Sequence, residues 1–170
     1  GWSGFKPFRV TRKQQESQTI CSFYLAATDS APLPNFKAGQ YITLRIPSAE
    51  GETTLRNYSL SNAPGQEALR ISVTREPAPT ADLPAGYASH WLHDHVQVGD
   101  ELEIAPPCGD FYLDTAEPAS RPLVLLAGGI GITPLMSILL SALSQQPERE
   151  IILVHANINP AVQAFKADLD

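Results

Sequence analysis

A change in the pattern of apolar residues near residues 115 to 120 constrains the fold of this chain more than any other feature of the sequence. Before it, short segments of alternating apolar and polar residues are separated by clusters of Pro, Gly, Asn and Asp. After it, two continuous apolar segments flank one stretch with apolar residues at helical spacing. Alternation is typical of antiparallel strands, and continuous apolar segments are typical of parallel strands buried on both faces. The sequence therefore predicts two different units, at residues 1–116 and 117–170.

The first unit contains six segments that are typical of short strands. Each shows apolar alternation or is enriched in β-branched and aromatic residues, and each is bounded by turn residues. Six short strands with little helix predict an antiparallel Greek-key β-barrel. One short helix is expected at residues 87–96, with Ser89 as its N-cap. The predicted strands are FRVTRKQ, ICSFYLAA, QYITLRIP, RNYSLS, ALRISVTRE and DELEIAPP.

The second unit has the pattern of a strand, a helix, a second strand and the start of a further helix. The strands are expected at PLVLLAGG and EIILVHANI, and the helices at residues 133–146 and from residue 159 onward. This order is the first part of a parallel-sheet, nucleotide-binding α/β domain. Such a domain usually contains more than two strands, so we expect the chain to be part of a longer protein.

The composition of the chain indicates which classes of binding partner are unfavourable and which cellular location is expected. The formal net charge is −6 and no run of lysines and arginines occurs, so nucleic acid and anionic membranes are poor partners. The longest apolar stretch, residues 123–140, is interrupted by three glycines and a proline and does not predict a membrane span. Two cysteines do not make a disulfide framework, and free thiols suit a cytoplasmic location.

A glycine-rich turn, AGGIGITPL, joins the first apolar strand to the helix that follows it. Gly128, Gly129 and Gly131 would let backbone N–H groups approach a ligand closely, and the helix N-terminus adds a positive field. Thr133 is expected to cap the helix, with Pro134 in its first position. This arrangement suits a nicotinamide nucleotide. A tight strand-to-helix turn without a ligand also needs glycine and remains the alternative.

An arginine, a tyrosine and a serine lie close together in LRNYSLSNAPG, which has the pattern of a buried strand. Arginine is costly to bury without an anionic partner. Arg56 and Tyr58 would point to the same side, so Arg56 could hold a phosphate while Tyr58 contacts a planar ring. Alternatively, Arg56 pairs with a surface carboxylate and Tyr58 packs in the core. Gly86 and Ser89 mark a second candidate anion site, for which a simple helix cap is the alternative.

Other chemistries receive less support. His90 and His93 are three residues apart on the expected helix, but no further ligand completes a metal set, so exposed histidines near the helix end are favoured. Cys108 has no cationic neighbour and is interpreted as a packed or incidental cysteine. No serine lies on a G-x-S-x-G turn, so a Ser-His-Asp hydrolase is not indicated.

Six motifs occur in this order along the chain: GQY, RNYSL, VTRE, GYASHWLHD, GDFYL and GGIGITP. Together they resemble the motifs of the ferredoxin–NADP reductase family. The resemblance is closest to the reductase part of flavohaemoglobins, which are nitric oxide dioxygenases. The resemblance implies FAD bound to the barrel, with Arg56 at its pyrophosphate. It implies catalytic roles for Tyr58, against the flavin, and Ser59, near the reactive nitrogen. The other cofactor-binding residues that it implies are Tyr41, Asn57, Val73, Thr74, Gly86, Ala88 and Ser89 for FAD, and Gly128, Gly129, Ile130, Gly131, Ile132 and Thr133 for NADH or NADPH.

The reaction implied by the resemblance is hydride transfer from NADH or NADPH to FAD, followed by electron transfer to haem. The haem would belong to a globin domain that lies outside this sequence, N-terminal to it, and that turns nitric oxide and oxygen into nitrate. Two alternatives remain: a related FAD-dependent reductase that serves another acceptor, such as an oxygenase with an iron–sulfur carrier, and a passive FAD-binding module. No metal site is expected in this chain.

Overall fold

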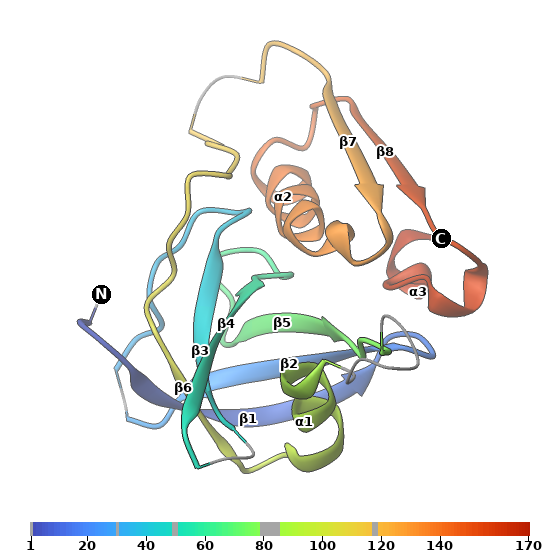
Figure 1. Ribbon diagram of the computed structural model, residues 1–170. Helices are drawn as coiled ribbons and strands as arrows, with labels where there is room; N and C mark the ends of the chain where they lie inside the picture. The colour runs from blue at the N-terminus through green and yellow to red at the C-terminus, as the bar shows by residue number, and fades with distance from the viewer. Residues whose placement is uncertain (1, 30, 49–50, 79–85, 117–118) are drawn as a thin grey trace.

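The computed structural model describes residues 2–29, 31–48, 51–78, 86–116 and 119–170. An antiparallel sheet unit lies beneath a smaller α/β unit, with the two packed against each other (Figure 1). The expected boundary between the units, after residue 116, adjoins residues 117 and 118, which lie outside the described residues. It therefore stays a prediction.

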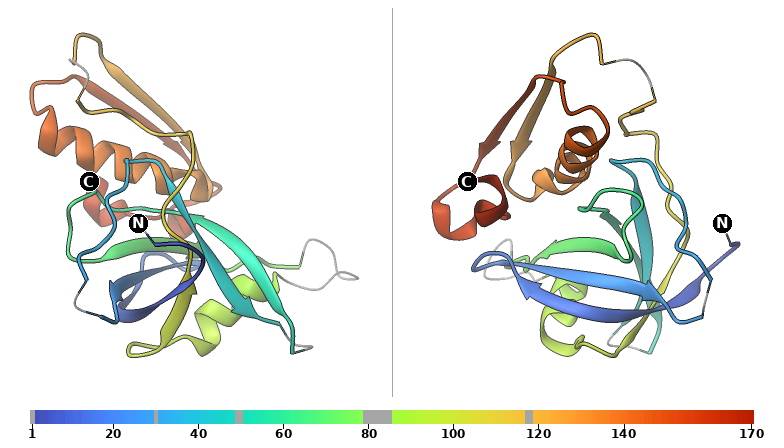
Figure 2. Two further views of the ribbon diagram at one scale, coloured as in Figure 1. Left: turned by 90° about the vertical axis from the view of Figure 1, so that its left-hand side faces the viewer. Right: turned by 180° about the vertical axis from the view of Figure 1, so that it is seen from behind.

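The first unit is a six-stranded antiparallel sheet, as predicted. The strand order is β4-β3-β6-β1-β2-β5, so β4 and β5 are its edges. An isolated bridge between Leu60 and Ile71 brings these edges together, and the predicted barrel is thus a strongly curved sheet (Figure 2). The strands are β1 (Lys6–Gln15), β2 (Ile20–Ala27), β3 (Tyr41–Pro47), β4 (Thr53–Ser59), β5 (Leu69–Thr74) and β6 (Glu101–Ile104).

The curved sheet encloses an apolar core formed by alternate side chains of its strands. Each fully buried aliphatic or aromatic side chain contributes about 1.5–3 kcal/mol. Ile42 and Leu44 of β3 are fully buried and pair with Tyr58 and Arg56 of β4. Paired residues of an antiparallel ladder share a face, so Tyr58 is directed toward this core, against which it packs.

One helix, α1 (Tyr87–His95), lies beside the end of β5. Its N-cap is Gly86, and the prediction that Ser89 caps it is wrong. Ser89 lies within the first turn, where its hydroxyl donates to the Gly86 carbonyl at 2.9 Å and accepts from the Glu76 amide at 3.1 Å. The serine therefore ties the helix to the residues after β5.

The second unit has the predicted order of strand, helix and parallel strand. Helix α2 covers one face of the β7–β8 sheet (Figure 1). The prediction that both faces of these strands are buried is wrong, because Val124, Leu126, Ile152 and Val154 on the other face are 46–71% exposed. The elements are β7 (Leu123–Gly128), the 3-10 turn η1 (Gly129–Gly131), α2 (Ile132–Gln145), β8 (Ile151–Ala156), the 3-10 turn η2 (Pro160–Val162) and α3 (Lys166–Leu169).

The chain enters α2 through the η1 turn, so the helix begins earlier than expected. Its N-cap is Gly131, and Thr133 and Pro134 occupy the second and third positions. The Thr133 hydroxyl donates to the carbonyl of Ile130 at 3.2 Å. The helix expected from residue 159 is instead two short turns, η2 and α3, since Phe165 between them adopts a left-handed φ of 58°.

The two units share a buried interface. Ile20 and Ala38 of the first unit belong to the same apolar cluster as α2 and Phe165. The Ser137 hydroxyl of α2 donates to the carbonyl of Asn62 at 2.7 Å. These contacts fix the start of α2 beside the edge strands β4 and β5.

Both cysteines are free, Cys21 buried and Cys108 exposed. Within the described ranges, the helices are too short or too polar to cross a membrane.

Candidate functional site

A cleft of about 440 Å³ lies where β4, the end of β5, the start of α1 and the turn into α2 meet. Its volume falls in the range of small-molecule sites, roughly 300–1,000 Å³. A larger cavity of about 730 Å³ lies between residues 62–68 and α2, but none of the predicted site residues lines it. The smaller cleft is the stronger candidate because an arginine, an aromatic ring and a helix N-terminus converge there.

The cleft brings together most of the residues that the sequence predicted. They come from five elements, β4, β5, α1, η1 and α2, in two units, and only the fold makes them neighbours. The predicted residues that line the cleft are Arg56, Asn57, Tyr58, Ser59, Val73, Thr74, Gly86, Ala88, Ser89, Ile130, Gly131 and Thr133.

Four predicted residues do not line the cleft. Tyr41 pairs with Ser59 in the sheet and has its hydroxyl beside Cys108, a hydrogen bond that raises the pKa of the tyrosine. Ile132 is the first residue of α2 and its side chain is fully buried. Gly128 and Gly129 precede the lining residues of the turn, and the Gly129 carbonyl is 2.9 Å from the Nε2 of His155. Sequence analysis also missed four lining residues: Ser72, Glu76, Tyr87 and Pro134.

Arg56 is exposed at the mouth of the cleft, so the prediction of a buried strand was wrong here. The reason is that β4 is an edge strand. One guanidinium nitrogen, Nη1, donates to the Thr54 hydroxyl at 2.6 Å and to the Leu55 carbonyl at 2.8 Å. Over the residues that the structure describes, no carboxylate forms an ion pair with Arg56. Its charge is therefore available to an anionic ligand.

Tyr58 combines a half-buried ring with a protonated hydroxyl. Its ring packs against the core while part of it lines the cleft. Burial raises the pKa of Tyr58 to about 12; the negative charge of Glu76 acts in the same direction, and Arg56 opposes it. The hydroxyl stays protonated at neutral pH and can donate a hydrogen bond.

The first turn of α1 supplies a group of backbone donors. The N–H groups of Tyr87, Ala88 and Ser89 have no acceptor within the helix, and the helix dipole makes this end positive. A Cβ at Gly86 would lie 2.7 Å from a carboxylate oxygen at the end of the flexible Glu76 side chain, so the Glu76 side chain lies close to the start of α1. Because the Ser89 hydroxyl is already bonded within the protein, its amide is the group left for a ligand.

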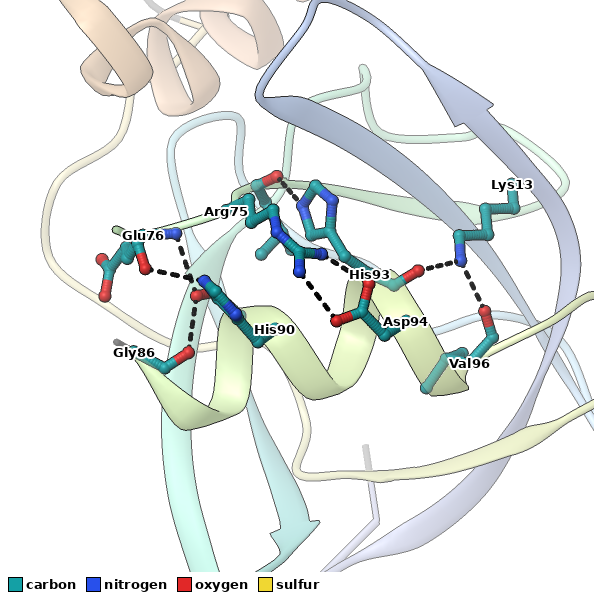
Figure 3. A network of polar contacts seen from close by, with 10 residues as sticks. Lys13, Arg75, Glu76, Gly86, His90, His93, Asp94 and Val96 are labelled. Carbon is teal, nitrogen blue, oxygen red and sulfur yellow. Dashed lines mark hydrogen bonds and ion pairs between the residues drawn. The ribbon is translucent and has the colours of Figure 1, made fainter. Parts of the chain in front are cut away.

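The two histidines considered as metal ligands point to different backbone carbonyls. The Nε2 of His90 is 2.9 Å from the Glu76 carbonyl, and the Nε2 of His93 is 2.7 Å from that of Val73 (Figure 3). Both are half-buried rather than exposed as expected, and burial lowers the pKa of His93. Over the described ranges, no group of three or more His, Cys, Asp or Glu side chains could hold a metal ion.

Comparisons with known proteins agree with this geometry. Residues 7–112 match the oxidoreductase FAD-binding domain family, and residues 125–170 match the oxidoreductase NAD-binding domain family. Over 171 residues, the chain is 43% identical to a flavohemoprotein of Bacillus subtilis, covering 100% of this chain and 40% of that protein. The chain thus spans less than half the length of this curated relative.

Two solved structures share the fold over nearly the whole chain. The flavohem-like FAD/NAD-binding domain of nitric oxide dioxygenase from Vibrio cholerae has a TM-score of 0.86 at 32% identity, covering 96% of this chain and 67% of that one. Phthalate dioxygenase reductase has a TM-score of 0.79 at 30% identity, covering 98% of this chain and 48% of that one. The chain therefore belongs to the ferredoxin–NADP reductase family, as an FAD-dependent oxidoreductase with an FAD-binding domain followed by an NAD-binding domain.

Proposed function

We propose that this chain is the reductase portion of a flavohaemoglobin-type nitric oxide dioxygenase. In this proposal it binds FAD in the cleft, accepts hydride from NADH or NADPH, and passes electrons to haem in a globin domain N-terminal to it. One observation carries the proposal: Arg56, with no carboxylate partner over the described residues, lines the same cleft as the first-turn amides of α1, which have no acceptor within the helix. A guanidinium and a helix N-terminus together suit a diphosphate.

The residues of the cleft fit FAD. Arg56 would hold phosphate oxygens through two charge-assisted hydrogen bonds, and the amides of Tyr87, Ala88 and Ser89 would bind the others. Tyr58 would present its ring to the flavin and donate from its protonated hydroxyl. Bound FAD supplies the conversion of a two-electron hydride into single electrons, while the protein supplies position and electrostatics.

The end of β4 and the turn into α2 would form the reacting part of the site. Ser59 would donate a hydrogen bond near the reactive flavin nitrogen. Ile130, Gly131 and Thr133 would form the wall against which NADH or NADPH is held, next to the positive N-terminus of α2. This wall would exclude water from the path of the hydride.

A reductase for an iron–sulfur acceptor is the second candidate. The solved structure of phthalate dioxygenase reductase, described as a module for electron transfer from pyridine nucleotides to [2Fe-2S], favours it. The haem acceptor is preferred because flavohemoproteins are 41% to 48% identical to this chain. The proposal includes a cytoplasmic location, which the two free cysteines support because thiols persist in reducing compartments.

The absorption spectrum of the purified chain tests this function. We expect a yellow flavin band after incubation with FAD, and loss of that band when NADH or NADPH is added without oxygen. A chain that stays colourless contradicts FAD binding. A yellow band that neither nucleotide bleaches supports a passive binding module instead. Rapid haem reduction by NADH in the full-length protein would separate the haem acceptor from an iron–sulfur acceptor.

A further inference from the structure

Helix α1 needs external contacts to hold its first turn in one place. It has nine residues, whereas isolated helices shorter than about 12–15 residues are marginal in water. Ala88 and Leu92 bury one side of it against the core of the curved sheet. Apolar contacts are not directional, so they define the angle of the helix less strictly than hydrogen bonds and ion pairs do. Polar contacts at both ends therefore add to the definition of its orientation.

The first turn is bonded to the backbone of Glu76. The Glu76 carbonyl accepts from the Gly86 amide at 3.3 Å and lies 2.9 Å from the Nε2 of His90. The Glu76 amide donates to the Ser89 hydroxyl at 3.1 Å. The cap residue Gly86 and two residues of α1, Ser89 and His90, therefore bond to the backbone N–H and C=O of one residue shortly after β5 (Figure 3).

The last turn is held by side chains. Arg75 makes a bidentate ion pair with Asp94, at 2.5 Å and 2.9 Å (Figure 3). The ammonium of Lys13 on β1 donates to the carbonyls of His93 at 2.6 Å and Val96 at 2.8 Å. A cation at these carbonyls is favourable because the C-terminal end of a helix is negative.

Two neighbouring residues directly after β5 thus hold opposite ends of one helix: the Glu76 backbone holds the first turn and the Arg75 side chain holds the last. We infer that Arg75 and Asp94 are positioning residues, which fix the angle of α1 and thereby keep its first-turn amides aligned with the phosphate groups of the ligand. Neither residue lines the cleft, so they act through the helix. The inference rests on the proposed FAD site.

The test replaces Asp94 by Asn, which keeps the shape of the side chain and removes its charge. We expect FAD to bind about twofold to fivefold more weakly, the range that corresponds to the loss of an exposed ion pair. We also expect the ³¹P resonances of the bound diphosphate to shift, a change that a general loss of stability would not cause. Asp94→Glu, which keeps the charge, should lie closer to the wild type in both measurements.

Glu103→Gln is the matched control, because it breaks the Arg45–Glu103 ion pair, which is about as exposed and lies on the sheet away from the cleft. It should leave FAD affinity and the ³¹P spectrum unchanged. The inference is overturned if Asp94→Asn binds FAD as the wild type does, or binds it more weakly with unshifted ³¹P resonances. If Asp94→Asn does not fold, Arg75→Lys provides the same comparison with one bond lost. Failure of the wild-type chain to bind FAD would instead contradict the proposed function.

Discussion

Replacing Arg56 by Ala tests the proposed diphosphate contact. The guanidinium is exposed, has no carboxylate partner over the described residues, and is oriented by its bonds to Thr54 and Leu55. Its removal therefore breaks no ion pair within the described protein and should not unfold it. The contact with phosphate is a hydrogen bond to a charged group, worth roughly 1.5–3 kcal/mol. FAD affinity should fall roughly 10- to 150-fold, since each 1.4 kcal/mol is a factor of ten.

Quenching of flavin fluorescence on titration with protein measures this affinity. Arg45→Ala is the control, because it removes the same charge from the neighbouring strand β3, where Arg45 pairs with Glu103. We expect the control to bind FAD as the wild type does, and the weaker binding of Arg56→Ala to depend less on salt. Equal affinity of Arg56→Ala and the wild type would refute the argument. So would equal losses in the two variants, which would indicate a long-range effect of net charge.

Three further changes should have separable effects. Ser59→Ala should retain FAD but slow its reduction by NADH, by roughly tenfold for one lost hydrogen bond, and unchanged stopped-flow rates would remove Ser59 from the reacting part of the site. Gly39→Ala should lower the free energy of unfolding by about 1–3 kcal/mol, because φ is +111° and a Cβ would lie 2.6 Å from the Phe111 carbonyl; an unchanged denaturation midpoint would contradict this. His93 has a pKa below 6.5 because it is buried, so the unfolded state binds the proton more readily and the free energy of unfolding should decrease as the pH falls below about 6.5. Urea unfolding between about pH 7.5 and pH 5.5 should show a smaller decrease in His93→Gln, and an equal decrease would rule out this cause.

The strands were predictable because their pattern is local. A segment rich in apolar and aromatic residues places β2 at residues 20–27 in both the sequence and the structure. Exposure was not predictable in the same way. Arg56 lies in an apolar context but on an edge strand, and Val124 lies on a sheet face that α2 does not cover. The exposure of both side chains depends on which strands and helices are neighbours in the fold, and the periodicity of the sequence does not indicate this.

The site was predictable where a motif marks it. RNYS and the glycine-rich turn contributed Arg56, Tyr58 and Gly131 to one cleft, although they are far apart in the sequence. Glu76 was missed because its role depends on its backbone, whose contacts with α1 form only in the folded chain. Ser89 was expected both at an anion site and as a helix cap; it lines the cleft, but it is not the N-cap, and its hydroxyl accepts from the Glu76 amide. The sequence offered one indication. Arg75 lies next to Glu76, and Asp94 is the nearest acidic residue of the expected helix, so an ion pair between Arg75 and Asp94 could have been predicted.

The central claim is that the diphosphate of FAD lies between the Arg56 guanidinium and the first-turn amides of α1. A crystal structure of this chain with FAD measures this directly. The account predicts phosphate oxygens within about 3 Å of both groups, with Arg56 no longer bonded only to its own strand. A flavin dinucleotide bound elsewhere, or one whose phosphates face solvent while Arg56 keeps its bonds to Thr54 and Leu55 alone, would contradict it.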